Sequence, residues 1–297
     1  MKVGKLLQDP KYSEKFVLQK LLCALLNCTR EYLWTDVDRE LDNEMVQKIS
    51  LAYDDYAIKK KPLEYVLGHV DFFGKEFFVN EATLIPRPET EYMITAVKEF
   101  VDGTLKMEDG KGMEGVLLDV GTGCGVLGIS VLLQNADTFR EVFFSDITPE
   151  SLVVAKKNYD THIDGSRYDA RFIQADLCAY LENYSDIIAG KDVILVANLP
   201  YIPEKTHDEQ NPERVKNREP RVAFVGGDDG LDYYRQMFNQ LHLLVENGTL
   251  NIENLMMFLE MMTWQVDILR QEFGDRIEFE EVKTFHFNIR IVKAWLK

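Results

Sequence analysis

Apolar residues recur at helical spacing through the first third of the chain. Over residues 13–28 they are separated by three or four positions, which predicts an amphipathic helix, and residues 40–58 repeat the pattern more weakly. Few residues in this part of the chain favour a strand. We therefore expect a small helical domain over residues 1–61.

The pattern changes over residues 62–91. Here Gly68 and Gly74 lie between short aromatic and β-branched runs, which predicts a β-hairpin. Pro86 and Pro88 have no backbone donor and hold the chain extended, so the hairpin is expected to end in a stiff turn. We interpret this segment as a connector between the helical domain and the rest of the chain.

Strands and helices alternate from about residue 113 onward. Strands are predicted for residues 116–120, 141–146, 170–176, 192–198, 248–253, 276–282 and 287–296. Helices follow the first two strands, and a third, over about residues 230–245, comes after a long polar loop over residues 202–229. This alternation is typical of an α/β domain with a mostly parallel sheet, here over residues 92–297. The last two strands are too close together for a helix between them, so they must pair antiparallel at one edge.

Residues 253–265 (ENLMMFLEMMTWQ) form a methionine-rich stretch inside this domain. We predict that the stretch is a packed helix rather than a binding surface. Methionine is flexible enough to serve either purpose, because its unbranched side chain adapts to its surroundings.

Composition and charge exclude several classes of protein. The 297 residues include 34 Lys and Arg against 50 Asp and Glu, and the net charge of −16 disfavours direct nucleic-acid binding by broad phosphate neutralisation. The four cysteines have neither zinc-ligand spacing nor the density of a disulfide framework, so no metal site is expected. The first residues are too polar for a signal peptide, and no apolar run is long enough to span a bilayer. We expect a cytoplasmic protein.

A glycine-rich turn follows the first strand of the α/β domain and opens a helix. Gly121, Gly123 and Gly125 alternate with Thr122 and Cys124. Glycines in this position let a ligand lie against the main chain. The spacing matches neither a phosphate loop nor a dinucleotide fingerprint. An ordinary glycine turn is the alternative, but the strand–turn–helix context favours a nucleotide-type ligand such as adenosine with an amino-acid tail.

Acidic residues end the next two strands. Asp146 lies about 20 residues after the glycines, where a carboxylate can accept hydrogen bonds from ribose hydroxyls, or can cap the following helix. Asp176 could accept a hydrogen bond from the amino group of adenine, with Leu177 against the ring. A solvated turn is the alternative reading of this second pair.

The fourth strand leads into Asn198-Leu199-Pro200-Tyr201. An amide or aromatic amine is a poor nucleophile, because its lone pair is delocalised. The side-chain oxygen of Asn198 and the backbone oxygen of Leu199 could accept both of its N–H groups and so present the lone pair to an electrophile. Pro200 would fix the turn, and Tyr201 would offer a packing face. Asn-x-Pro is also a common turn, but all four sites fall at strand ends, where open α/β sheets bind ligands.

These motifs together resemble the HemK/PrmC family, the peptide chain release factor glutamine N5-methyltransferases. The resemblance covers most of the chain, and its most specific part is the LIPRPETE segment. It rests on residues 62–68, 84–91, 121–125, 146, 198–201, 219–221 and 226–231.

The resemblance implies a class I, Rossmann-like methyltransferase fold that uses S-adenosylmethionine. The glycine loop would contact the methionine part of this cofactor, Asp146 its ribose, and Asp176 and Leu177 its adenine. Asn198 and the backbone oxygen of residue 199 would hold the substrate glutamine. The helical domain would bind the release factor, whose Gly-Gly-Gln loop enters the cleft. The chain would act as a monomer.

Three other functions stay open at this point. They are glutamine methylation of a ribosomal protein, N6-adenine methylation of nucleic acid, and S-adenosylmethionine binding without transfer. The chain departs from the family at Leu199, where proline is usual, and in the length and apolar character of residues 253–265. The backbone oxygen at 199 is unaffected by this change, but the stiffness of proline is lost.

Overall fold

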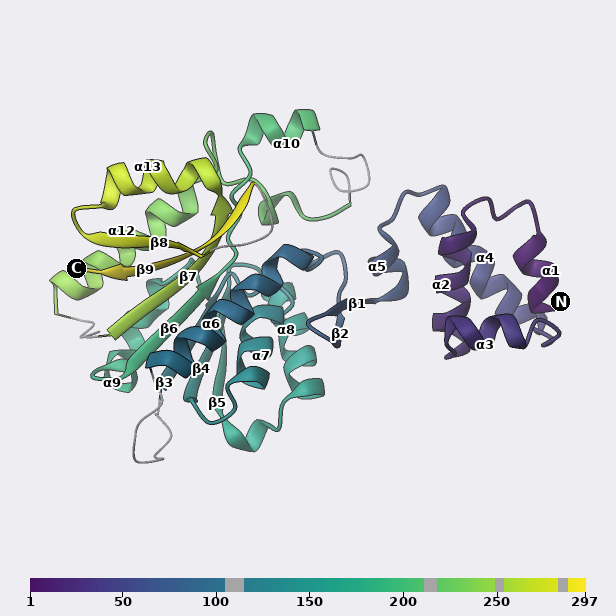
Figure 1. The fold of residues 1–297 in the computed structure, drawn as a ribbon, viewed down its shortest axis with the longest axis horizontal. Helices are drawn as coiled ribbons and strands as arrows, with labels where there is room; N and C mark the ends of the chain where they lie inside the picture. Colours follow the sequence, from purple (N-terminus) through teal and green to yellow (C-terminus); the bar gives the residue numbers. More distant parts are fainter. Residues whose placement is uncertain (105–114, 211–217, 249–253, 283–287) are drawn as a thin grey trace. The chain divides into compact units, whose positions relative to one another are not determined.

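The computed structural model describes residues 1–104, 115–210, 218–248, 254–282 and 288–297. It divides into two compact units, which are described separately and drawn in Figure 1. Among the described residues, one unit contains residues 1–69 and 218, and the other contains residues 70–104, 115–210, 219–248, 254–282 and 288–297.

The first unit is helical. Its helices are α1 (Val3–Gln8), α2 (Lys15–Leu26), α3 (Arg30–Thr35), α4 (Asn43–Ala57) and α5 (Leu63–Leu67). Helices α2 and α4 confirm the two predicted helices, and their apolar faces meet in a small core around Leu18, Leu22 and Ile49. Thr29 and Asp42 cap α3 and α4, because each side chain accepts a hydrogen bond from a backbone N–H of the first turn.

The predicted hairpin is formed by β1 (His69–Phe72) and β2 (Lys75–Phe78). A 3₁₀ turn, η1 (Pro88–Thr90), then leads into α6 (Glu91–Thr104). Pro88 stands at the first position of this turn, where its missing N–H leaves no hydrogen bond unmade.

The second unit is built on a seven-stranded sheet in the order β5-β4-β3-β6-β7-β9-β8. Its strands are β3 (Gly115–Val120), β4 (Phe139–Asp146), β5 (Asp169–Gln174), β6 (Asp192–Ala197), β7 (Asn254–Met262), β8 (Ile277–Val282) and β9 (Ile289–Leu296). The first five are parallel, and β9 pairs antiparallel with both β7 and β8. This confirms the predicted α/β fold, with the antiparallel pair at one edge.

Helices cover both faces of the sheet, as Figure 1 shows. Helices α6, α7 (Val126–Gln134) and α8 (Pro149–His162) lie over one face, and α12 (Asp232–Glu246) and α13 (Thr263–Phe273) over the other. The core on the second face includes Tyr234 and Phe238 of α12, packed with Leu195 of β6. The sheet is therefore buried on both sides, and only its edges and strand ends are open to ligands.

The helix predicted for residues 253–265 is wrong, because residues 254–262 form strand β7 between β6 and β9. Met257, Phe258 and Met261 are fully buried there. A central strand covered on both faces reads as a continuous apolar run, which periodicity cannot distinguish from a buried helix. Most of the strand predicted for residues 248–253 lies outside the described residues.

The polar loop predicted for residues 202–229 contains a helix, α10 (Glu204–Gln210), and a 3₁₀ turn, η4 (Arg221–Ala223). Helix α10 has the sequence EKTHDEQ, which carries no apolar stripe to signal a helix. Among the residues that the structure describes, no helix is both long and apolar enough to cross a membrane.

One side chain of α8 ties the hairpin to the loop that follows β3. Asn158 accepts a hydrogen bond from the backbone N–H of Phe78 at 2.8 Å, and its Nδ2 donates to the backbone oxygens of Phe78 at 2.9 Å and Cys124 at 2.8 Å. The amide oxygen and the NH₂ group of Asn158 are thus both engaged by backbone groups, which belong to two separate segments.

Candidate active site

A pocket opens at the carboxyl ends of β3, β4, β5 and β6, with an empty volume of about 1050 Å³ out to open solvent. Each of the four strand-end segments singled out in the sequence contributes to its lining. The lining residues from these segments are Gly121, Thr122, Gly123, Cys124, Asp146, Asp176, Leu177, Asn198, Leu199 and Pro200. Gly125 and Tyr201 lie beside these residues in the chain but do not line the pocket.

The glycine loop turns sharply from β3 into α7. Gly121, Gly123 and Gly125 all have positive φ angles, of 68°, 55° and 81°, which L residues rarely adopt. A Cβ atom on Gly121 would lie 2.9 Å from Cδ2 of Leu199, whose side chain is buried. The leucine that replaces the expected proline therefore packs directly against the glycine loop.

Asp119, the last-but-one residue of β3, holds this loop from beneath. Its Oδ2 accepts hydrogen bonds from Oγ1 of Thr122 at 2.6 Å and from the backbone N–H of Gly128 at 2.9 Å. Burial raises the pKa of Asp119 to about 6, against the opposing effect of these two donors. The sequence analysis assigned no role to Asp119. The available signal was an acidic residue two positions before the first glycine of the loop.

Asp146 ends β4 and accepts two backbone hydrogen bonds, from Gly123 to Oδ2 and from Thr148 to Oδ1, both at 2.9 Å. The bond to Thr148 closes a turn before α8 and does not cap the helix, because the N-cap residue of α8 is Thr148 and no side chain caps it. Burial raises the pKa of Asp146 despite these donors. Each oxygen of the ionised carboxylate keeps a further lone pair, so the side chain can still accept bonds from a ligand.

Asp176 and Leu177 form the turn after β5. Asp176 is exposed, and its Oδ2 accepts a hydrogen bond from Nε2 of Gln236 at 2.6 Å. Leu177 has a φ of 53°, an uncommon value for a residue with a Cβ, and its side chain is buried. Such strain is found at ligand sites held by the surrounding structure.

The segment from Asn198 to Tyr201 crosses the end of β6. Nδ2 of Asn198 donates to Oγ1 of Thr90 at 3.1 Å. The hydroxyl of Tyr201 donates to Oε1 of Glu260 at 3.0 Å, inside the protein. Burial, and then the charge of Glu260, raise the pKa of Tyr201 well above its ordinary value. Tyr201 therefore anchors the segment from its far end.

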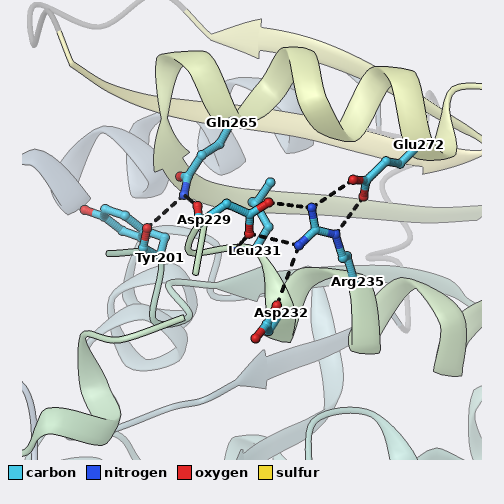
Figure 2. Close-up of polar contacts among 7 residues, drawn as sticks. All are labelled: Tyr201, Asp229, Leu231, Asp232, Arg235, Gln265 and Glu272. Atoms are coloured by element: carbon cyan, nitrogen blue, oxygen red, sulfur yellow. Dashed lines mark hydrogen bonds and ion pairs between the residues drawn. The ribbon is translucent and has the colours of Figure 1, made fainter. Parts of the chain in front are cut away.

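A second network fixes the backbone of the same segment (Figure 2). Nε2 of Gln265 donates to the backbone oxygens of Tyr201 and Asp229, each at 2.8 Å. The Asp229 carboxylate binds Arg235 at 2.6 Å, and Arg235 also binds Glu272. A side chain on Gly230 would clash, because its Cβ would lie 2.1 Å from the backbone oxygen of Tyr201. The sequence analysis identified residues 226–231 only through the family resemblance. In the structure, Gly230 packs against the backbone of Tyr201 and Gln265 joins Asp229 to it, so both residues support that backbone.

The proline-rich segment forms one wall of the pocket and is tied to the segment that follows Arg218. Glu219, whose side chain is 1% exposed, accepts hydrogen bonds from the backbone N–H of Ile85 at 3.1 Å and from Nη2 of Arg87 at 2.8 Å. Arg87 and Glu219 do not line the pocket themselves, but their chain neighbours Pro86 and Pro220 do. The ion pair therefore joins two walls that are far apart in the sequence.

Comparison with known proteins gave no matching family model. Curated relatives do match over most of the chain. The release factor glutamine methyltransferase of Bacillus anthracis is 36% identical over 224 residues, which cover 74% of this chain and 72% of the relative. The release factor glutamine methyltransferase of Francisella tularensis is 28% identical over 289 residues, covering 96% and 91%.

Solved structures share the fold at low sequence identity. The hMettl16 catalytic domain in complex with MAT2A 3'UTR hairpin 6 has a TM-score of 0.53 at 12% identity, covering 86% of this chain and 82% of that one. The delta-N METTL16 MTase domain has a TM-score of 0.52 at 13% identity, covering 86% and 97%. At such identities the likeness establishes a methyltransferase fold and nothing finer.

Proposed function

Because the chain belongs to the family of release factor glutamine methyltransferases, we propose that it methylates the Gly-Gly-Gln loop of a peptide chain release factor. The methyl group would pass from S-adenosylmethionine to the side-chain amide nitrogen of the glutamine. One observation carries the proposal: the glycine loop, the Asp146 carboxylate and the Asn198 amide converge on a single pocket.

The pocket fits the expected cofactor. The positive-φ glycines leave the main chain of the loop accessible for the methionine part, and Asp146 retains acceptor capacity for ribose hydroxyls. Leu177 offers a buried apolar surface for adenine, with Asp176 beside it. When bound, S-adenosylmethionine would supply an electrophilic methyl group on a positively charged sulfonium. The negative charge of the carboxylates at this site is compatible with that positive charge.

The chain's own contribution to the reaction would be to hold an amide in position. The Nδ2 of Asn198 is engaged by Thr90, which leaves Oδ1 for an N–H of the substrate. The backbone oxygen of Leu199 would accept the second N–H, and the buried Leu199 side chain keeps that oxygen in place. Acceleration then comes from orientation and electrostatics rather than from a strong base.

We assign substrate recognition to residues 1–61, the connector to residues 62–91 and methyl transfer to residues 92–297. The separate core of the helical unit supports its role as a recognition module, since it folds around its own apolar residues. The protein would act in the cytoplasm as a monomer, without direct nucleic-acid binding.

The function is tested by incubating the protein with labelled S-adenosylmethionine and the release factor of the same organism. Mass spectrometry should place one methyl group on the glutamine of the Gly-Gly-Gln loop. Parallel reactions would contain ribosomal proteins and an adenine-containing duplex. Label on either of these, with none on the release factor, would replace the proposal.

A further inference from the structure

Glu260 is a carboxylate buried in the sheet directly behind the substrate segment. It lies near the carboxyl end of β7 and is 1% exposed. Oε1 accepts the hydroxyl proton of Tyr201, whereas Oε2 makes no hydrogen bond to any residue that the structure describes. A buried carboxylate with an unsatisfied oxygen destabilises a fold, so its presence calls for a functional reason.

The charged groups around Glu260 do not offset this cost. The carboxylate of Glu89 acts on it as a like charge, and Tyr234 donates its hydroxyl to the backbone oxygen of Glu260 rather than to its side chain. Burial raises the pKa of Glu260 to about 7, while the Thr90, Tyr201 and Asn198 side chains oppose the rise. The three side chains that favour the ionised form of Glu260 therefore all belong to the substrate segment, residues 198–201, or contact it.

Thr90 links Glu260 to Asn198. The contact that the geometry shows is between Thr90 and Asn198, since Oγ1 of Thr90 accepts the Nδ2 proton of Asn198 at 3.1 Å. The side chains of both residues lower the pKa of Glu260, as groups that donate toward its carboxylate do. A hydroxyl has one proton to give. When that proton is directed at the carboxylate, the oxygen of Thr90 is left as an acceptor, and only the NH₂ end of Asn198 can satisfy it.

The orientation of the Asn198 amide decides whether the site works. An amide can present either its oxygen or its NH₂ group to a pocket, and only the oxygen can accept an N–H of a substrate amide. A carboxylate behind the amide attracts the NH₂ end and repels the oxygen end, so the oxygen is left facing outward.

We propose that Glu260 is a positioning residue that orients the Asn198 amide through Thr90 and holds the other end of the segment through the Tyr201 hydroxyl. The role rests on the proposed function, because it concerns the acceptor that this function requires. Glu260 does not itself line the pocket, so it acts through the residues that do.

The test is the isosteric change Glu260→Gln, assayed on the release factor. The glutamine can donate to Thr90 and Tyr201, which turns the Thr90 proton toward Asn198 and favours the opposite amide orientation. We expect kcat to fall tenfold or more. The affinity for S-adenosylhomocysteine, measured by calorimetry, should stay within twofold, and the thermal unfolding temperature at pH 8 should not fall. Glu141→Gln is the matched control: Glu141 is a largely buried carboxylate of β4 that pairs with Arg171, outside the pocket, and the variant should keep the kcat of the wild type.

A second pair of variants separates positioning from mere packing. Thr90→Ser keeps the hydroxyl and should keep kcat within threefold, whereas Thr90→Val has the same shape without the hydroxyl and should lose as much as Glu260→Gln. The double variant Glu260→Gln/Thr90→Val should be no worse than either single variant, because both break the same link.

The inference is overturned if Glu260→Gln transfers methyl groups within twofold of the wild-type rate. It is equally overturned if Thr90→Ser and Thr90→Val lose activity alike, a result that still decides the matter if Glu260→Gln fails to fold. A wild-type protein that leaves the release factor unmethylated would instead overturn the proposed function, and the inference falls with it.

Discussion

Gln265 donates a hydrogen bond from Nε2 to the backbone oxygen of Tyr201 across 64 positions of sequence. The same nitrogen serves Asp229, and Oε1 accepts the backbone N–H of Met262 at 2.8 Å. One side chain at the start of α13 thus satisfies three backbone groups from three segments, and Figure 2 shows the two contacts with Tyr201 and Asp229. Because Gln265 is fully buried, water cannot replace it.

Gln265→Met should therefore destabilise the protein, since it keeps the volume of the side chain and leaves three buried backbone groups unpaired. We expect a loss of about 2–4 kcal/mol in the free energy of unfolding. Urea denaturation measures it. The control is Gln271→Met on the exposed face of the same helix, which should change stability by less than about 0.5 kcal/mol. Equal effects at the two positions would contradict the role of Gln265.

Asn198→Ala removes the proposed acceptor without disturbing the glycine loop. We expect turnover on the release factor to fall about 100-fold or more, as for the loss of one oxyanion-hole donor, with unchanged affinity for S-adenosylhomocysteine. Steady-state kinetics and calorimetry on the same preparation separate the two effects. Near-normal turnover in this variant would rule out the amide-holding mechanism.

Asp146→Asn tests the ribose assignment. The amide keeps the size of the side chain but can no longer accept at both oxygens while the N–H groups of Gly123 and Thr148 occupy it. We expect cofactor affinity to drop about tenfold or more, corresponding to about 1.4 kcal/mol. Asp137→Asn, an exposed residue paired with Arg167, should bind as the wild type does. If Asp146→Asn also bound normally, the carboxylate would serve only to hold the backbone of Gly123 and Thr148.

Stability should depend on pH through Glu260. Its folded pKa of about 7 lies above the ordinary value of 4.5, so the folded state binds the proton more tightly than the unfolded state. The free energy of unfolding must then decrease as the pH rises from about 4.5 to 7. Over that window the wild type should lose on the order of 3 kcal/mol relative to Glu260→Gln. The buried Asp119 contributes a slope of the same sign below pH 6, but it is present in both proteins and cancels in the difference. Denaturation curves at pH 5, 6, 7 and 8 give the free energy of unfolding of the wild type minus that of the variant. This value should fall as the pH rises, and a value that rises with pH would contradict the assignment.

The sequence was sufficient to predict the parallel strands β3, β4, β5 and β6 and the residues at their ends. The glycine loop, Asp146 and Asn198 each follow a strand. Because parallel strands place their carboxyl ends at the same edge of a sheet, the strand pattern alone predicts that these residues meet. What could not be predicted were contacts made between elements distant in sequence. Glu260 was hidden in a methionine-rich run that resembled a helix, and its function depends on meeting Tyr201 and Thr90, which periodicity does not report. The contacts of Glu219, which was named only through the family resemblance, and of Gln265 were missed for the same reason, because each side chain satisfies backbone groups more than 60 residues away.

The three hydrogen bonds of Asn158 bear on where a working fragment of this protein can begin. A fragment starting at residue 92, just inside α6, would lack Phe78. Asn158 would then lose two of its three hydrogen bonds and keep only the one to the backbone oxygen of Cys124. That oxygen belongs to the glycine loop, so the deletion would loosen the wall of the pocket from a distance. A fragment starting at Val70 retains both contacts. The hairpin is therefore an integral part of the second unit. Trimming the protein to its seven-stranded sheet and the helices on it would remove the contact through which Asn158 holds the glycine loop.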